Sequence, residues 1–507
     1  MANYTNSKKS VLNILSSVFN QLFIIIFGLF IPRLYLTTYG SEVNGLLNSI
    51  GQVFTYLTLL EAGVGTATLT SLYKPVAEND KTSISEIMAA THKFYKKTGT
   101  IYFVAILALS LLYPLIVKCE LPLWEIALII ILNGLPGVVS YFFQGKYNIL
   151  LQAEGKSYII TNLTTIVTFC INISKVILML IGFDVIAIQI SYFVFSIAKT
   201  VYIMIYIKRY YKWLNLEAKP NFEAIAQKDS VLVMELCDMV FRHTDIIILT
   251  LFCDLKVVSV YVIYNSLLST ISTFMDAFSQ GFSFALGQKF NTNRELYIKL
   301  HDVYETYRMT LVFSLDAIAY IFIIPFIKLY TLGVTDIEYI DKYLPVLFIS
   351  SFLLTNGRAN SASVINYAKH FKQTRWRCVL EAMINITVSI ILVNLIGIYG
   401  VLIGTIAALL YRANDMIIYA NKKILNRTPW ITYKRWLILI ISFIGIEFAV
   451  SFINVDLSSY IRIFLWAVVA CIVIIPLFFI IISIFEPKQA KFAYSYFKRY
   501  MKKLLNH

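Results

Sequence analysis

The fold is decided by residues 158–207, which read YIITNLTTIVTFCINISKVILMLIGFDVIAIQISYFVFSIAKTVYIMIYI. Only Lys175, Asp184 and Lys199 are charged in this stretch. A helix needs about 20 apolar residues to cross the hydrocarbon core of a bilayer, so the stretch is long enough for two spans. The turn residues Gly182-Phe183-Asp184 divide it. We therefore predict two consecutive transmembrane helices, 158–182 and 184–207.

The rest of the chain has the same character. Of its 507 residues, 58% are hydrophobic and 14% are charged. Soluble domains have roughly 45–50% apolar residues and about 25% charged residues. This composition predicts an all-α, polytopic membrane protein with about 14 transmembrane helices. In the first half the predicted spans are 11–36, 43–73, 100–117, 123–150, 158–182 and 184–207. In the second half they are 230–252, 257–284, 309–329, 343–366, 378–397, 398–419, 436–453 and 458–484.

The basic residues set the orientation of these spans, because cytoplasmic loops hold an excess of Lys and Arg. Of the 44 Lys and Arg, only five fall in the loops of one side: Lys118, Lys256, Lys328, Lys342 and Arg462. Seven lie within spans, and the other 32 lie at the N terminus, in every second loop and in the tail. We expect both termini in the cytoplasm. The net charge of +15 then reflects orientation and predicts no nucleic-acid partner.

Three stretches of the first half return in the second half. Gln144-Gly145-Lys146-Tyr147-Asn148 returns as Asn356-Gly357-Arg358-Ala359-Asn360, Asn172-Ile173-Ser174 returns as Asn385-Ile386-Thr387, and Phe19-Asn20-Gln21 returns as Phe241-Arg242-His243. The matches keep their order along the chain. They predict two pseudo-symmetric six-helix bundles around a central cavity, related by an axis along the membrane normal.

This repeat gives the expected organisation of the chain. Residues 1–207 and 230–419 would be the two bundles, joined by a cytoplasmic linker at 208–229. Residues 436–484 would be an added helix pair, and 485–507 a basic cytoplasmic tail.

The seventh span carries a stripe of charged residues, namely Glu235, Asp238, Arg242 and Asp245. At 100° per residue they share one helix face. A charge at the bilayer centre costs roughly 2.5–3.5 kcal/mol, so this face must meet protein or water. The alternative to a hydrated cavity is a self-neutralising network in which Arg242 pairs with Asp238 and Asp245.

Uncharged polar residues occupy the repeat-equivalent positions of the first span. They are Asn13, Ser16 and Asn20, each 222 residues before a member of the stripe. We infer that both polar faces line the central cavity.

We expect different roles for the other basic residues within the spans. Arg33 and Lys175 lie where the positive-inside rule disfavours them, so each is a candidate partner for an anionic substrate. Lys146 lies near a cytoplasmic end and is expected to reach the interface. Arg412 and Asp415 are three residues apart and are expected to form a pair on a helix surface.

Motifs for catalysis are missing from the sequence. It has no Gly-x-x-x-x-Gly-Lys-Ser/Thr phosphate loop, and its five histidines show no metal-binding spacing. We expect no enzyme activity, no cofactor and no metal.

Several segments resemble a known family. Gly28-Leu-Phe-Ile-Pro-Arg33-Leu-Tyr-Leu, Tyr39-Gly40 and the glycines at 63 and 65 resemble the opening of the polysaccharide-transporter flippases, in the multidrug/oligosaccharidyl-lipid/polysaccharide (MOP) exporter superfamily. Gln152-Ala153-Glu154-Gly155-Lys156 and Asp245-Ile-Ile-Ile-Leu249 are also similar to that family. Leu72 departs from it, because a basic residue is expected there.

The resemblance implies a flippase of the bacterial plasma membrane. Such a protein turns undecaprenyl-pyrophosphate-linked oligosaccharide repeat units over to the outer leaflet, by alternating access, for capsule, O-antigen or exopolysaccharide synthesis. Its partners would be the lipid-linked oligosaccharide, membrane lipids and the polysaccharide polymerase machinery. The expected pyrophosphate ligands are Arg33, Lys175, Arg242 and Arg358. Glu235, Asp238 and Asp245 would bind a coupling cation or sugar hydroxyls.

Two alternatives remain open. A cation-coupled drug antiporter of the same superfamily would also place acids in its cavity. A membrane glycan polymerase or ligase would be expected to carry a larger outward loop than the longest one here, at about 330–342.

Overall fold

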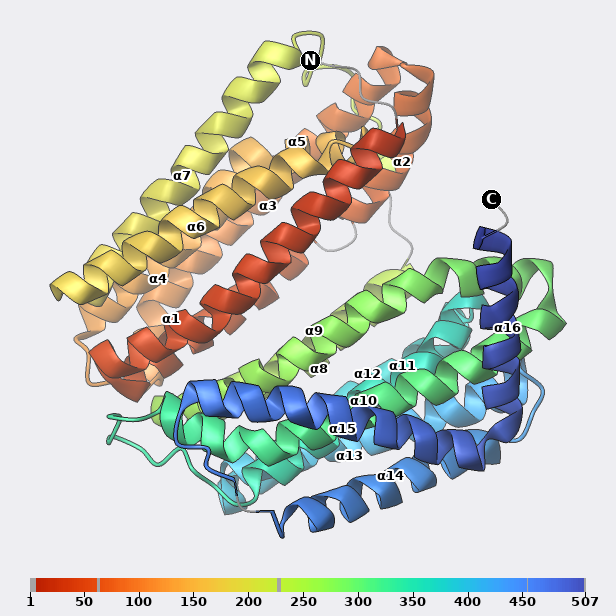
Figure 1. Ribbon diagram of the computed structural model, residues 1–507. Helices are drawn as coiled ribbons and strands as arrows, with labels where there is room; N and C mark the ends of the chain where they lie inside the picture. Colours follow the sequence, from red (N-terminus) through yellow and green to blue (C-terminus); the bar gives the residue numbers. More distant parts are fainter. Residues whose placement is uncertain (1–5, 62–63, 226–228, 454, 506–507) are drawn as a thin grey trace. The chain divides into compact units, whose positions relative to one another are not determined.

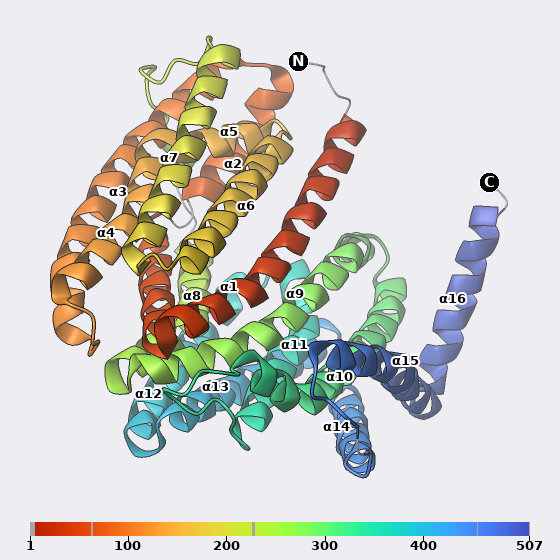
Figure 2. The same ribbon diagram turned by 60° about the vertical axis from the view of Figure 1, so that its left-hand side comes forward.

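The computed structural model describes residues 6–61, 64–225, 229–453 and 455–505, and every regular element in these ranges is a helix. The predicted all-α fold class is confirmed. The helices form two compact units, one within Met1–Ser259 and one within Val260–His507 (Figures 1 and 2). The predicted bundle boundaries at 207 and 230 stay predictions.

In the first unit, polar turn residues start and stop the helices. Its elements are α1 (Asn6–Leu57), a 3-10 turn (Thr58–Glu61), α2 (Val64–Glu78), α3 (Lys81–Ile116), α4 (Leu123–Val139), a π segment (Ser140–Gln144), α5 (Gly145–Ala153), α6 (Ser157–Ile181), α7 (Val185–Tyr210), a 3-10 turn (Glu223–Ile225) and α8 (Asp229–Phe252). The Asp80 carboxylate accepts from the N–H groups of Thr82 and Ser83 and so caps α3. Gly182 ends α6 in the left-handed conformation, with φ of 87°.

The first predicted span and the first part of the second form one long element, α1, with a kink instead of a loop. The kink is at Gly40, where φ is 83°, a conformation that only glycine adopts at little cost. Five residues on, a Cβ at Gly45 would overlap the carbonyl oxygen of Leu255. Glycine therefore both turns the chain and lets the start of α9 (Leu255–Thr292) approach closely.

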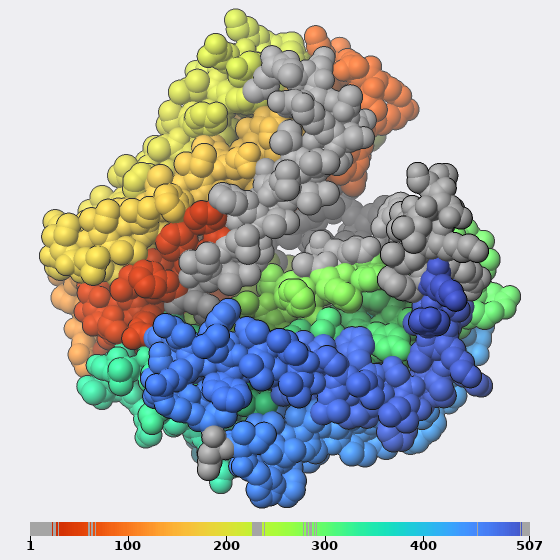
Figure 3. Space-filling view, in the orientation of Figure 1, coloured from red at the N-terminus to blue at the C-terminus, as the bar shows by residue number. Residues whose placement is uncertain are grey.

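The second unit continues with the helices that follow α9. They are α10 (Arg294–Tyr330), α11 (Leu344–Tyr367), α12 (Phe371–Ile396), α13 (Ile398–Tyr419) with a π segment (Ala420–Ile424), α14 (Trp430–Val450), α15 (Tyr460–Phe485) and α16 (Pro487–Leu505). Helices α12 and α13 pack tightly because Gly400 and Gly404 lie against the backbone of Leu392 and Ser389. Helices α10, α14 and α15 share a core that includes Phe313, Ile446 and Phe478. Side chains of α15 cover one face of this unit in Figure 3.

The loop that joins α10 to α11 is tied to its own unit through Asp341. The carboxylate accepts from the N–H groups of Tyr343 and Leu344 at 2.7 and 2.8 Å, and from the Tyr399 hydroxyl. Burial raises the pKa of Asp341, but these hydrogen bonds outweigh it and the net pKa lies below the usual value.

The described helices agree with the predicted spans. Nine helices within the described ranges are long and apolar enough to cross a membrane: α3, α4–α5, α6, α7, the first part of α9, α10, α12, α13 and α15. Of the five other predicted spans, 11–36, 230–252, 343–366 and 436–453 coincide with the first part of α1, α8, α11 and α14. The span predicted at 43–73 does not form one helix, because it covers the second part of α1, the 3-10 turn and the beginning of α2. The chain is thus a multi-pass membrane protein, and a count of about 14 spans is consistent with it.

Candidate functional site

Lys175 is held between two helices of the first unit. It lies on α6, and its Nζ sits 5.8 Å from the centre of the Tyr35 ring on α1, which is 5% exposed. Phe27 and Phe169 pack edge to face across the same helix pair. No carboxylate pairs with Lys175 among the residues that the structure describes. This position suits an anionic group, because a cation in a low-dielectric site is costly when it is unpaired.

Arg33 lies two residues before Tyr35 on α1. Two residues correspond to a 200° turn of a helix, so Arg33 projects from a different face of α1 than Tyr35. The side chain is half-buried. The role of Arg33 as a pyrophosphate ligand stays a prediction.

The charged stripe of the seventh span falls on α8. Arg242 is exposed, whereas Asp245 is 4% exposed. Between them, His243 Nδ1 lies 2.6 Å from Gln52 Oε1 and the Thr244 hydroxyl lies 2.7 Å from that of Tyr56. These polar contacts fix α8 against the second part of α1.

Several predicted site residues cannot be placed. The side chains of Asn13, Ser16, Asn20, Glu235 and Asp238 lie outside the described part of the structure. Their predicted cavity-facing role stays a prediction.

Arg358 lies in a buried group of charges, which we call the α11–α13 ion cluster: Arg358, Arg377, Glu381, Arg412 and Asp415. Arg358 of α11 pairs with Glu381 of α12. Arg412 of α13 lies 3.3 Å from Glu381 Oε2 and 2.8 Å from Asp415 Oδ2, and Arg377 pairs with Asp415. Among the described residues the cluster holds three cations and two carboxylates, and its most exposed member is Arg377, with a side chain that is 36% exposed.

The pair of Arg412 and Asp415 was predicted correctly, but its surface location was wrong. The Arg412 side chain is 1% exposed, and its guanidinium also lies 3.0 Å from the Cys378 sulfur. The packing of α12 against α13 covers it. Spacing along one helix cannot show which face a neighbouring helix covers.

The two copies of the repeated stretch around Gly145 and Gly357 have similar surroundings in the structure. A Cβ at Gly145 would overlap the Tyr95 ring, and a Cβ at Gly357 would overlap the Trp436 ring. The next residue in each copy, Lys146 or Arg358, is buried, at 3% and 9% exposed. Lys146 donates to the carbonyl of Phe142 at 2.7 Å. The prediction that Lys146 reaches the interface is therefore wrong, and its alignment with Arg358 was the signal that could have shown this.

A second buried charge group joins α10 to α14 and to the end of α15. Arg435, which is fully buried, lies 3.0 Å from Asp302 Oδ1 and also pairs with Glu305. Arg427 lies 3.1 Å from Glu305 Oε2, and Lys434 lies 2.9 Å from Glu486 Oε1. Three cations face three carboxylates here, so the group is balanced and holds helices together.

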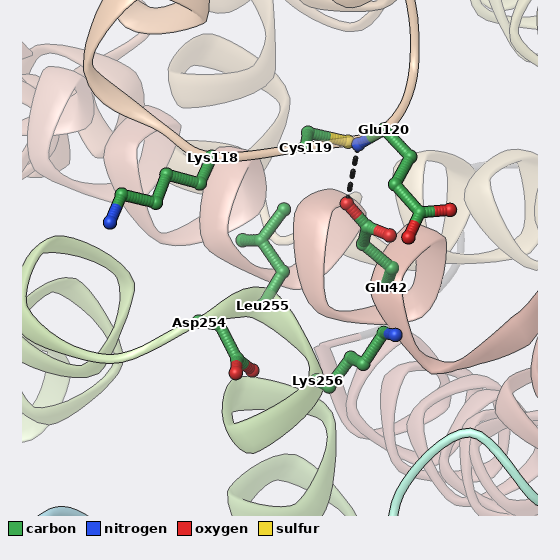
Figure 4. Close-up of a pocket in the computed structure, with 7 residues that line it drawn as sticks. All are labelled: Glu42, Lys118, Cys119, Glu120, Asp254, Leu255 and Lys256. Carbon is green, nitrogen blue, oxygen red and sulfur yellow. Dashed lines mark hydrogen bonds between the residues drawn. The ribbon is translucent and has the colours of Figure 1, made fainter.

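A small pocket of about 360 Å³ lies among loops of the first unit (Figure 4). Its lining residues are Glu42, Lys118, Cys119, Glu120, Asp254, Leu255 and Lys256. The N–H of Glu120 donates to the Glu42 carboxylate at 2.6 Å, and burial raises the pKa of the Cys119 thiol to about 11. Among the described residues, no group of His, Cys, Asp and Glu is placed to hold a metal ion.

The whole fold resembles solved transporter structures. It matches the lipid II flippase MurJ in an inward closed conformation with a TM-score of 0.65 and 14% identity, over 94% of this chain and 99% of that one. It matches an inward-facing multidrug resistance transporter of the MATE family, in the MOP superfamily, with a TM-score of 0.60 and 13% identity, over 80% of this chain and 94% of that one. A MATE structure in a bent conformation gives a TM-score of 0.54 and 14% identity, over 85% and 97%.

Sequence comparisons add no family. No family model matches the chain, and no curated protein sequence matches it. At these levels of identity the structural matches establish the fold and leave the substrate open. The chain has the helical fold of these solved transporter structures.

Proposed function

We propose that this protein is a flippase that moves an undecaprenyl-pyrophosphate-linked oligosaccharide across the bacterial plasma membrane for polysaccharide synthesis. The observation that carries the proposal is an excess of positive charge among the described residues of each unit, at half-buried or buried positions. Lys175 has an aromatic ring and no described carboxylate beside it, and the α11–α13 ion cluster has one cation more than it has carboxylates. Such sites favour an anionic ligand.

A pyrophosphate fits this charge better than a cationic drug does. In the proposed cycle, the pyrophosphate meets Lys175 in one unit and Arg358 in the other, as access alternates between the two sides of the membrane. Arg33 and Arg242 stay candidates for the same role. The lipid tail stays in the bilayer beside the added helices, within 436–484, and both termini face the cytoplasm.

The extent of the structural similarity supports the same choice. The match to the lipid II flippase leaves 6% of this chain uncovered, whereas the match to the inward-facing MATE transporter leaves 20%. The match to a lipid II flippase therefore supports the proposal of a lipid-linked substrate.

A cation-coupled drug antiporter is the second candidate. It is favoured by the buried Asp245 on α8 and by the MATE matches. In that case the acids of α8, with Glu235 and Asp238, would hold the coupling cation.

Reconstituted vesicles distinguish the two functions. Full-length protein would be placed in vesicles that contain a fluorescent undecaprenyl-pyrophosphate oligosaccharide, and transfer would be followed by the access of an external lectin. We expect Lys175→Gln and Arg358→Gln each to slow transfer about 10-fold or more, since charge-assisted hydrogen bonds contribute roughly 1.5–3 kcal/mol. Lys118→Gln, which removes a cation from a surface pocket, is the matched control.

Two results would contradict the proposed flippase function. Unchanged transfer by both variants would remove the proposed cation sites. Cation-driven efflux of a drug, with no transfer of the oligosaccharide by wild-type protein, would favour the antiporter.

A further inference from the structure

Helix α14 leaves an apolar groove along one of its sides, which we call the α14 groove. The helix packs against α10 and α15. On its other side, towards α11 and α13, there is a cavity of about 1010 Å³, and a second of about 380 Å³ shares Leu354, Leu410, Trp436 and Ile440 with it. The two cavities form one groove that lies entirely within the second unit.

The groove has the length of a bilayer core. Its lining residues on α14 run from Trp430 to Ser451, which at 1.5 Å per residue is about 31 Å, against about 30 Å for the hydrocarbon core. Ile444 and Phe448 on its rim are 62% and 66% exposed. A groove that is apolar, open at the rim and parallel to a membrane helix is accessible to the chains of membrane lipids.

One charged residue interrupts the apolar lining. Glu447 lies near the Ser451 end and is the only ionisable acid or base among the groove residues that the structure describes. Its Oε1 atom is buried and has no hydrogen-bond partner among the described residues, and the same holds for Trp436 Nε1. An unpaired carboxylate at membrane depth is costly, so a cationic hydrogen-bond donor beside it would be stabilising.

The position of Trp436 shows that the groove is built into the packing of the unit. Its ring fits over Gly357, where any side chain would overlap it, and packs edge to face on Phe313. The indole is therefore fixed as the floor of the groove, where α14 contacts α11. The open volume lies on either side of this floor.

We propose that the α14 groove binds a membrane lipid with an ammonium headgroup, with the ammonium on Glu447 and one acyl chain along the groove towards Trp436. The charge of Glu447 selects against anionic headgroups. The need for an N–H donor selects a primary amine over a quaternary one, because only the former can donate a charge-assisted hydrogen bond. The lipid comes from the leaflet nearer to Ser451.

Native mass spectrometry of the full-length protein tests this assignment. The protein would be equilibrated with equal amounts of phospholipids that carry ethanolamine, choline or glycerol headgroups on identical acyl chains. We expect the wild-type protein to retain the ethanolamine lipid about 10-fold over the others, and Glu447→Gln to lose this preference. Glu120→Gln, which removes an exposed acid in the first unit, should keep it.

A second variant tests the groove apart from its charge. Ser350 lines the groove from α11, and Ser350→Phe would fill it while Glu447 stays in place. We expect this variant to lose the retained lipid, with a melting temperature close to that of the wild type. An amine preference that survives in Glu447→Gln, or is missing in the wild type, would overturn the proposal. A dimer that Ser350→Phe disrupts would assign the groove to a second copy of the chain and also overturn it.

Discussion

Replacing Glu381 by Gln should destabilise the second unit strongly. Glu381 is 6% exposed and is the carboxylate shared by Arg358 and Arg412 in the α11–α13 ion cluster. Its loss leaves three buried or half-buried arginines with one acid, Asp415. Removing one partner of a buried ion pair costs about 3–5 kcal/mol. For a unit of this size that corresponds to a fall in Tm of roughly 6 °C or more.

The assay is thermal unfolding of purified full-length protein in detergent, followed by the loss of the monodisperse peak in size-exclusion chromatography. The double variant Arg358→Gln/Glu381→Gln removes the pair together. It should be more stable than Glu381→Gln alone, because only Arg412, which keeps Asp415 as a partner, is then left opposite a neutral amide. A Tm for Glu381→Gln within about 2 °C of the wild type, or a double variant no more stable than the single one, would refute this account of the cluster.

Three further predictions concern other parts of the chain. Gly357→Ala should cost about 1–3 kcal/mol, because the new Cβ would overlap Trp436, and adding Trp436→Phe should recover part of the lost Tm. The Lys175→Gln variant should keep the wild-type Tm while losing protection of the purified protein by added inorganic pyrophosphate against thermal unfolding, because Lys175 has no described carboxylate to leave unpaired. The loop at Asp341 should stay ordered at neutral and mildly acidic pH. A lowered pKa of Asp341 stabilises the fold at pH values above the ordinary Asp pKa of about 3.9, and this stabilisation is lost as the pH falls through the folded-state pKa. The order of the loop is measured by hydrogen exchange of the N–H groups from which Asp341 accepts hydrogen bonds.

The controls for these predictions are specific. Gly445 of α14 has no atom within 4 Å of an added Cβ, so Gly445→Ala should not lower the Tm as Gly357→Ala does. Equal pyrophosphate protection in wild type and Lys175→Gln would contradict the role of Lys175. Exchange at the loop that rises steadily between pH 7 and pH 5 would contradict the lowered pKa of Asp341.

The sequence was sufficient to predict the helices because their signal is local. Each predicted span is an apolar run bounded by charged residues, and all but the one at 43–73 fall largely within one continuous helical segment. The continuous helix across Gly40 was not predicted, because the same sequence pattern is compatible with a kink at Gly40 and with a short loop. Fold class therefore followed from composition and periodicity alone.

The charge groups depend on contacts that the sequence does not encode locally. Glu305 meets Arg435 from 130 residues away, and Glu381 meets Arg358 from 23 residues away. No helical periodicity connects such residues. The repeat could have linked Lys146 to Arg358, because both follow a glycine that lies beneath an aromatic ring.

Glu447 was visible in the sequence as a single acid within a span. Nothing in its neighbours along the chain marks it as part of a groove, because the other walls come from α10, α11 and α13. Its environment becomes apparent only when these helices are packed together.

The proposed flippase activity is tested most directly in cells depleted of this protein and in cells that express it again. The measured quantity is the share of lipid-linked oligosaccharide that an outer-leaflet probe can reach. We predict that intact repeat units accumulate on the inner leaflet after depletion and become accessible again when the protein returns. Repeat units that reach the outer leaflet without the protein, whether or not they are then polymerised, would contradict the proposal.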